Sequence, residues 1–189
     1  MYVIFEGVDG AGKSHLASEC AVRWRRMGRR VSVLSEPFFP RSMLSRVRAQ
    51  SFLEQSMIFD RYRVRAYERR IMPLLSKGRS LFQVRSWVST AVYQYYRGGY
   101  LDLLPSYISL SLGLMPEEPV FIILDVDYPT ARMRKTDLEW DGSTYDKLRS
   151  GYYWIANYLF RKNLSVAVIR NNLDVDSAIN RIMLFLESC

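Results

Sequence analysis

The chain has 189 residues, of which 49% are hydrophobic and 24% charged, and this suits a single domain with a sizeable core. No apolar run reaches the roughly 18 residues of a membrane span, the N-terminus lacks a signal-peptide pattern, and the two cysteines have no metal-ligand spacing. The composition therefore excludes a membrane partner and favours the cytoplasm, while a net charge of +8 without RNA-binding motifs favours small nucleotides over nucleic acid.

The first element predicted is a buried strand over residues 2–5, followed at once by a glycine-rich loop. Residues 7–14 fit the pattern G-x-x-x-x-G-K-S, in which main-chain N–H groups form a nest for phosphates. Lys13 is expected to reach the β- and γ-phosphates of ATP, and the Ser14 hydroxyl is expected to bind Mg²⁺. The predicted ATP-binding residues are Gly7, Val8, Asp9, Gly10, Ala11, Gly12, Lys13, Ser14 and His15.

The rest of the chain alternates between helical and strand patterns. In chain order it reads as a helix over 13–27, a strand over 31–34, a loop over 35–42, a mostly helical stretch over 43–77 with a break near Ser51 and a kink or turn at Pro73, a strand over 81–84, helices over 87–96 and 101–113, and a loop over 116–119. After it come a strand over 120–126, a short helix after Pro129, a polar loop over 136–144, a helix over 145–161, a strand over 164–169 and a helix over 174–186 with Asp174 as its N-cap. Such alternation predicts an α/β fold with a five-stranded parallel sheet and helices on both faces.

The acidic residue inside the phosphate loop, Asp9, limits which P-loop proteins the chain resembles. The pattern Gly7-x-Asp9-Gly10-x-Gly12-Lys13-Ser14 resembles that of thymidylate kinases, P-loop enzymes that phosphorylate dTMP to dTDP, and the likeness continues to about Gln94 and more loosely to about Ala156. The resemblance implies a three-layer P-loop kinase fold, ATP and Mg²⁺ as cofactors, a deoxynucleoside monophosphate as acceptor with dTMP expected, and a homodimer. It also implies that Asp9 approaches the acceptor's sugar or organises the phosphates.

Two further stretches resemble the family's acceptor site. In Glu36-Pro37-Phe38-Phe39-Pro40-Arg41-Ser42, Glu36 and Arg41 match substrate-binding positions, and the guanidinium fork of Arg41 suits a phosphate. In Phe59-Asp60-Arg61-Tyr62-Arg63, Phe59 matches the ring that stacks on thymine and Arg63 the arginine that hydrogen-bonds the base. Arg61, and less so Arg65, are rivals for the role of Arg63.

A fourth match lies after the third strand. Arg85 takes the position of a family arginine that binds the transferring or acceptor phosphate. Thr90 matches a polar group at the edge of the base, and Tyr93 matches the ring that lies under the deoxyribose. Ser89 belongs to the same substrate-binding motif. Val84 stands where the family has an aspartate that helps to place the metal or hold the arginine.

The last match is a lid over about 134–144, with Arg134 as its expected catalytic arginine. Lys13, Asp9, Arg85 and Arg134 are thus the predicted catalytic set, acting by position and charge because the acceptor phosphate is already anionic. Asp125, which ends the most apolar strand, is an alternative metal ligand.

Two other functions stay open. In a deoxynucleoside kinase, Glu36 would be the general base for a neutral 5′-hydroxyl, and Arg85-Ser86 would match an E-R-S pattern. The chain could instead be an inactive, nucleic-acid-associated relative that binds ATP without turnover. The sequence pI of about 9.6 and the valine at position 84 suggest this alternative.

Overall fold

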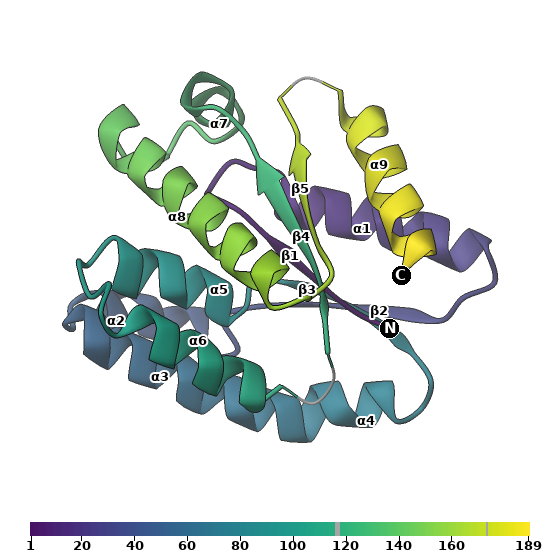
Figure 1. Ribbon diagram of the computed structural model, residues 1–189, viewed down its shortest axis with the longest axis horizontal. Coiled ribbons are helices and arrows are strands. Elements are labelled where there is room, and N and C mark those ends of the chain that lie inside the picture. Colours follow the sequence, from purple (N-terminus) through teal and green to yellow (C-terminus); the bar gives the residue numbers. More distant parts are fainter. Residues whose placement is uncertain (116–117, 173) are drawn as a thin grey trace.

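The computed structural model describes residues 1–115, 118–172 and 174–189, and its centre is a parallel β-sheet (Figure 1). Its strands lie in the order β2-β3-β1-β4-β5. Their bounds are β1 Tyr2–Glu6, β2 Val31–Ser35, β3 Ser80–Val84, β4 Val120–Asp125 and β5 Val166–Arg170. The predicted five-stranded parallel sheet is confirmed, with strand boundaries within two residues of the expected ones.

The central strand β1 explains why its sequence is almost entirely apolar. It pairs with β3 on one side, Ile4 opposite Gln83, and with β4 on the other, Ile4 opposite Phe121. Helices cover both faces of this strand, so side chains that point either way enter the core, and each residue of β1 is buried. All the strands run in one direction, so their C-terminal ends and the loops that follow meet at one edge.

Helices form the two outer layers. Figure 1 shows α1 (Lys13–Arg26) and α9 (Val175–Ser188) on one side of the sheet, and α3 (Phe52–Ala66), α5 (Trp87–Thr90), α6 (Leu104–Gly113) and α8 (Gly142–Arg161) on the other. The shorter helices are α2 (Leu44–Arg48), α4 (Met72–Leu75) and α7 (Tyr128–Arg134), with a 3₁₀ turn at Arg41–Met43 and π-helical turns at Tyr67–Ile71 and Ala91–Tyr96.

Local hydrogen bonds explain where several helices begin. The break predicted near Ser51 is the N-cap of α3, where Ser51 and Glu54 form a reciprocal capping box. Helix α8 begins at Gly142, three residues before the predicted start, because the Asp141 side chain accepts a hydrogen bond from the Thr144 N–H at 2.7 Å. The polar stretch predicted as a loop over 136–144 therefore includes the first turn of α8.

Three other expectations need correction or limits. Pro73 lies in the first turn of α4 and the chain stays helical through it, because the preceding π-helical turn already interrupts the regular hydrogen-bond ladder. Asp174 is at the N-cap of α9, but its side chain makes no capping bond to any residue that the structure describes. Residues 116 and 117 of the loop predicted over 116–119 lie outside the described residues.

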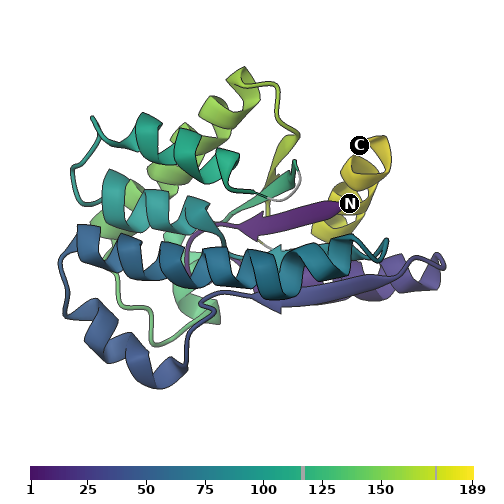
Figure 2. The same ribbon diagram turned by 90° about the horizontal axis from the view of Figure 1, so that it is seen from below.

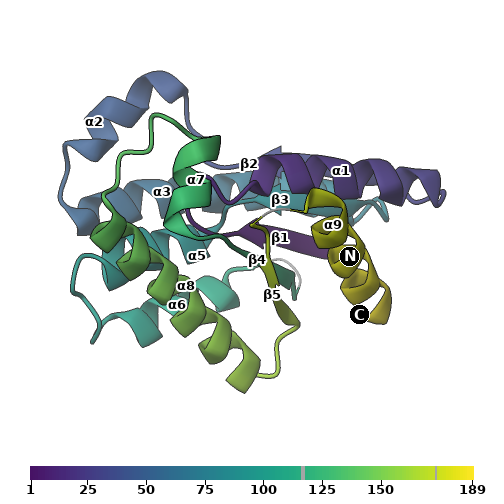
Figure 3. The ribbon, with the colours of Figure 1, turned by 90° about the horizontal axis from the view of Figure 1, so that it is seen from above.

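Loops distant in the sequence meet at the C-terminal edge of the sheet. Figures 2 and 3 show α2 and the segment between α7 and α8 at this same end of the molecule. Among the described residues, no helix is both long and apolar enough to cross a bilayer.

Candidate active site

The loop between β1 and α1 has the backbone geometry of a phosphate nest. Gly7 and Gly12 adopt φ of 138° and 84°, values that side chains other than glycine rarely accept. A Cβ atom on Gly7 would come within 2.4 Å of the Leu124 carbonyl oxygen, so the loop packs directly against β4. Its mouth is a cavity of about 260 Å³, lined by Asp9, Gly10, Gly12, Lys13, Ser14, His15, Ser35, Val84 and Arg85. We call this space the phosphate cavity.

Lys13 lies at the base of the phosphate cavity and is turned back onto its own loop. Its Nζ donates hydrogen bonds of 2.8 Å to the carbonyl oxygens of Gly7 and Val8. Burial, and then repulsion from Arg85, lowers the pKa of Lys13 to about 7. A triphosphate would supply the negative charge that this buried ammonium lacks, which is the match expected of a nucleotide-binding lysine.

The donor atoms of the phosphate cavity fit a magnesium ion that is held mainly by phosphates. The exposed Ser14 hydroxyl and the Asp9 carboxylate line the cavity, whereas Val84 contributes no oxygen. The described residues include no cluster of three or more His, Cys, Asp or Glu side chains that would bind a metal by themselves. Mg²⁺ commonly takes one or two protein oxygens and completes its shell with phosphates and water, so this sparse set suits it.

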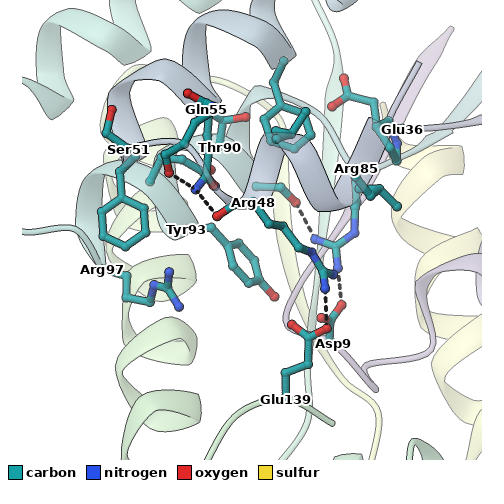
Figure 4. A pocket seen from close by; sticks show the side chains of 18 of the residues that line it. Asp9, Glu36, Arg48, Ser51, Gln55, Arg85, Thr90, Tyr93, Arg97 and Glu139 are labelled. Carbon is teal, nitrogen blue, oxygen red and sulfur yellow. Dashed lines mark hydrogen bonds and ion pairs between the residues drawn. The ribbon is translucent and has the colours of Figure 1, made fainter. Parts of the chain in front are cut away.

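A second and larger space opens beside the phosphate cavity, with a volume of about 880 Å³. We call it the acceptor cavity, and Figure 4 shows most of the side chains that line it. Nearly all the substrate-binding residues predicted from the sequence line it: Asp9, Glu36, Arg41, Phe59, Arg85, Ser89, Thr90 and Tyr93. The structure thus brings together residues from the β1–α1 loop, the segment after β2, α3, the end of β3 and α5 with the π-helical turn that follows it, and of the predicted set only Arg63 is not part of the lining.

Arg85 and Asp9 lie where the two cavities meet, because both residues line both spaces. An Arg85 Nη donates to the Asp9 carboxylate, and the other donates to Ser89 Oγ at 3.0 Å. Burial alone would raise the pKa of Asp9, but the positive charges of Arg85, Lys13 and Lys135 outweigh it and hold that pKa below its ordinary value. A charged carboxylate and a guanidinium therefore stand at the junction.

Arg63 lies behind the wall of the acceptor cavity. Its Nε and one Nη bind the two oxygens of Glu36 at 2.7 and 2.8 Å. Further bonds reach Asp60 and, at 3.1 Å, the Thr90 hydroxyl. Arg63 therefore reaches the acceptor cavity through Glu36 and Thr90, and its expected contact with a base stays a prediction. Arg61 and Arg65, its rivals, are exposed and do not line the cavity.

Aromatic rings supply flat apolar surfaces to the acceptor cavity. Phe59 is half-buried and lies with its ring centroid 5.3 Å from that of Phe39. The ring centroids of Tyr93 and Trp140 lie 6.0 Å apart, and the Arg85 guanidinium carbon lies 5.5 Å from the centroid of the Tyr93 ring. The cavity therefore has a charged end at Arg85 and Asp9 and ring surfaces beyond it, which suits a phosphorylated molecule that carries an aromatic base.

The segment between α7 and α8, residues 135–141, contributes Lys135, Glu139 and Trp140 to the lining of this cavity. Lys135 Nζ lies 3.8 Å from Asp9 Oδ2, and Glu139 forms an ion pair of 2.6 Å with Arg48 of α2 (Figure 4). Trp140 packs against Arg97, whose guanidinium is 4.6 Å from its ring. These contacts tie the segment to α2 and to the π-helical turn after α5.

Arg134 does not take the predicted position. Its guanidinium donates to the main-chain oxygens of Asn171 and Asn172 at 2.6 and 2.9 Å, in the loop after β5, and it lines neither cavity. Its neighbour Lys135 lies beside Asp9 instead. The difference arises because Arg134 ends α7 on the side that faces two carbonyl groups.

Asp125, the alternative metal ligand, is also bound elsewhere. Both of its oxygens accept hydrogen bonds from Arg149 of α8, one at 2.7 Å, and it lines neither the phosphate nor the acceptor cavity. Hydrogen bonding to Arg149 holds the pKa of Asp125 below its usual value even though burial would raise it. Asp125 thus joins β4 to α8.

Several lining residues of the acceptor cavity were not predicted from the sequence. They are Arg48, Gln55, Gln94, Arg97, Lys135, Glu139 and Trp140. The basic run Arg132-Met133-Arg134-Lys135 pointed to the right region for Lys135. The predicted lid over 134–144 includes Glu139 and Trp140. No pattern in the sequence distinguished Arg48, Gln55, Gln94 and Arg97 from ordinary surface or core residues, because they come from three separate segments.

The chain is similar to known proteins over most of its length. The model of the family described as thymidylate kinase matches residues 5–180. The thymidylate kinase of Pelodictyon phaeoclathratiforme is 30% identical over 198 residues, covering 96% of this chain and 85% of the relative. That of Caldanaerobacter subterraneus is 28% identical over 165 residues, covering 80% and 79%. The crystal structure of thymidylate kinase from Ehrlichia chaffeensis superposes with a TM-score of 0.76 at 21% identity over 98% of each chain, a likeness of fold.

Proposed function

Because the chain belongs to the thymidylate kinase family, we propose that the phosphate cavity binds the ATP phosphates and that the acceptor cavity binds dTMP. The protein is a nucleoside monophosphate kinase, and its reaction is ATP-dependent phosphorylation of dTMP to dTDP. The observation that supports this assignment of cavities is the placement of Arg85 and Asp9 in the lining of both.

In this proposal, each residue acts on one of two phosphates that must meet in line. The nest of residues 7–14 and Lys13 hold the ATP tail, and Mg²⁺ bound at Ser14 would neutralise the charge shared by the β- and γ-phosphates. Arg41 and Arg85 hold the dTMP phosphate, whose oxygen attacks without needing a base because it is already anionic. The ring surfaces of Phe59 and Tyr93 hold the base and sugar.

The closing segment 135–141 forms the lid in this proposal, at the centre of the region predicted over 134–144. Lys135, beside Asp9, supplies the cation that faces the transferring phosphate, and Trp140 and Glu139 exclude water from the acceptor. Arg63 acts indirectly, because it holds Glu36 and Thr90 in the cavity wall.

A substrate screen tests the function. ADP release from ATP is measured with each common deoxynucleoside and deoxynucleoside monophosphate, and the highest kcat/KM is expected for dTMP with no turnover of thymidine. Turnover of thymidine but not dTMP would favour a deoxynucleoside kinase with Glu36 as base, although Glu36 oxygens already accept bonds from Arg63 and Gln83. ATP binding without any turnover would leave only a nucleotide-binding relative.

We also propose that the enzyme is a cytoplasmic homodimer. Leu110 of α6 and its two cap residues, Leu103 and Leu114, are spaced seven and four residues apart, are 68%, 48% and 56% exposed, and offer one apolar face. A second copy of the chain would cover this face. Light scattering after size exclusion should give twice the mass of one chain, and Leu110→Glu should halve it; a monomeric wild-type protein at tens of micromolar would refute the dimer.

A further inference from the structure

Gln83 is a polar residue in the middle of the core. It lies on β3, is completely buried, and is flanked by Phe82 and Val84. Its Nε2 donates to the main-chain oxygen of Arg85 at 2.8 Å and to Glu36 Oε1 at 3.3 Å, and its Oε1 accepts a bond of 2.6 Å from the Tyr2 hydroxyl. A buried amide is tolerated only when its polar atoms are paired, and these bonds pair both ends of the amide.

The Arg85 main chain is the partner that connects Gln83 to the active site. Arg85 has a φ of 67°, in the left-handed region, where a residue with a side chain carries a strain of about 1 kcal/mol or more. Such a conformation persists when the surroundings impose it. The Arg85 N–H donates to the Phe5 carbonyl at 3.0 Å, its C=O accepts from Gln83, and the next N–H, of Ser86, donates to the buried Glu6 carboxylate.

This conformation decides where the Arg85 guanidinium points. Because the side chain leaves the backbone at the end of β3, the φ of that residue sets whether the guanidinium reaches Asp9 at the junction of the cavities. The side chain of the neighbour Val84 has no polar atom, and Val84 lines the phosphate cavity. Of the β3 side chains, the Gln83 amide is the one that bonds the Arg85 main chain.

We propose that Gln83 is a positioning residue for the acceptor phosphate, because its amide holds the Arg85 main chain in the conformation that presents the guanidinium to that phosphate. The proposal rests on the proposed function, since it takes Arg85 to be the phosphate ligand of dTMP. Gln83 touches no substrate itself, so its effect depends on whether the ligand carries a phosphate.

Binding measurements with paired ligands test this role. Gln83→Met keeps the length of the side chain and removes the donor and acceptor. Calorimetry should show that dTMP binding is weakened about 10-fold or more, which is the size expected when the hydrogen bond between Arg85 and the charged phosphate is lost. Thymidine has no phosphate, so its binding should change by less than about 2-fold. ATP binding should also stay within about 3-fold. In an Arg85→Ala background, Gln83→Met should have no further effect on dTMP affinity.

The control is Tyr2→Phe, which removes the third hydrogen bond of the same amide and leaves those to Arg85 and Glu36. It should leave the affinities for dTMP and thymidine unchanged. If Gln83→Met weakens the binding of dTMP and of thymidine equally, the amide acts through Glu36 in the cavity wall or through the fold as a whole, and the proposal is overturned. Unchanged dTMP binding would also overturn it. If Gln83→Met does not fold, Gln83→Leu is measured in its place.

Turnover of dTMP by the wild-type protein separates the two ideas. An active wild type with a Gln83→Met variant of normal dTMP affinity would refute the role of Gln83 and leave the function intact. A wild type that neither binds nor phosphorylates dTMP would refute both.

Discussion

The Arg63 guanidinium and the Glu36 carboxylate form a bidentate ion pair inside the protein, at 2.7 and 2.8 Å, with side chains only 3% and 5% exposed. Breaking such a pair leaves a buried charge without a partner. We expect Arg63→Met to lower the free energy of unfolding by about 3–5 kcal/mol, measured by urea denaturation. The matched control is Arg48→Met, which breaks the exposed Arg48–Glu139 pair and should cost less than about 1 kcal/mol. Equal effects of the two changes would contradict this view of the buried pair.

Arg85 should matter for turnover far more than for ATP binding. Arg85→Ala removes the guanidinium at the junction of the two cavities, and we expect kcat/KM for dTMP to fall about 10²- to 10³-fold. Arg85→Lys keeps the charge but not the fork that binds Asp9 and Ser89, so it should recover only a small part of the activity. ATP affinity, measured by calorimetry, should remain similar in both variants. Unchanged turnover in Arg85→Ala would remove this residue from the site.

The neighbours Lys135 and Arg134 should differ sharply. Lys135 lies 3.8 Å from Asp9, whereas Arg134 binds two carbonyl groups after β5. Lys135→Ala should therefore lower kcat about 10²-fold, and Arg134→Ala should change kcat by less than about 3-fold. Steady-state kinetics of the two variants at saturating ATP and dTMP provides the comparison. The reverse ranking would show that the lid changes conformation when substrates bind, so that Arg134 becomes its catalytic cation.

Lys13 should take up a proton when ATP binds. Burial lowers its pKa to about 7, so at pH 8 the free protein holds Lys13 mostly neutral. The triphosphate favours the charged form and raises this pKa, so binding at pH 8 should be coupled to uptake of up to about one proton, with little uptake at pH 6. Calorimetry in two buffers of different ionisation enthalpy measures the number. Lys13→Met should abolish the uptake, and a wild type without pH-dependent uptake would contradict the lowered pKa.

The same pKa makes the unliganded protein sensitive to pH. An unfolded lysine titrates near pH 10.4, so between about pH 7 and 10 the unfolded state binds more protons at Lys13 than the folded state. The contribution of Lys13 to stability therefore rises with pH over this range. Urea unfolding of the wild type and of Lys13→Met is compared at pH 7 and 9. The free energy of unfolding of the wild type, relative to that of Lys13→Met, should be larger at pH 9 than at pH 7. A smaller relative value at pH 9 would refute the lowered pKa of Lys13.

Val84→Asp should strengthen the binding of magnesium. Val84 lines the phosphate cavity together with Ser14 and Asp9, and the substitution adds a carboxylate where the cavity now has an apolar side chain. We expect the Mg²⁺ concentration for half-maximal activity to fall several-fold, because carboxylate oxygens are preferred ligands. Val84→Asn, which adds an uncharged oxygen, is the matched variant and should have a smaller effect. If both variants behave like the wild type, the metal lies away from Val84.

The elements that follow local rules were predicted well. The apolar runs at 2–5 and 120–126 are the buried strands β1 and β4, since parallel strands covered on both faces need apolar side chains throughout. The phosphate loop was found from the spacing of Gly7, Gly12 and Lys13, because the turn itself requires those residues. The start of α8 was missed by three residues, since it depends on a single capping bond from Asp141.

Most of the predicted substrate-binding residues line the acceptor cavity, and the two predicted arginines that do not line it carry long charged side chains. Arg63 was assigned to the base and Arg134 to the lid from their place along the chain, and each binds groups brought near by folding: Glu36, 27 residues away, and the carbonyl of Asn171, 37 residues away. A flexible cation turns to the nearest acceptor in space, and the sequence does not contain that distance.

The sequence by itself therefore determined the order of strands and helices, the phosphate nest and most of the residues that line the acceptor cavity, because those features depend on side-chain size, polarity and short spacings. Only the tertiary structure decided which cations line the two cavities and which are neutralised inside the protein. It also gave Gln83 its partners on β1, at the end of β2 and beyond the end of β3. These outcomes depend on directions and distances between segments that folding alone brings together.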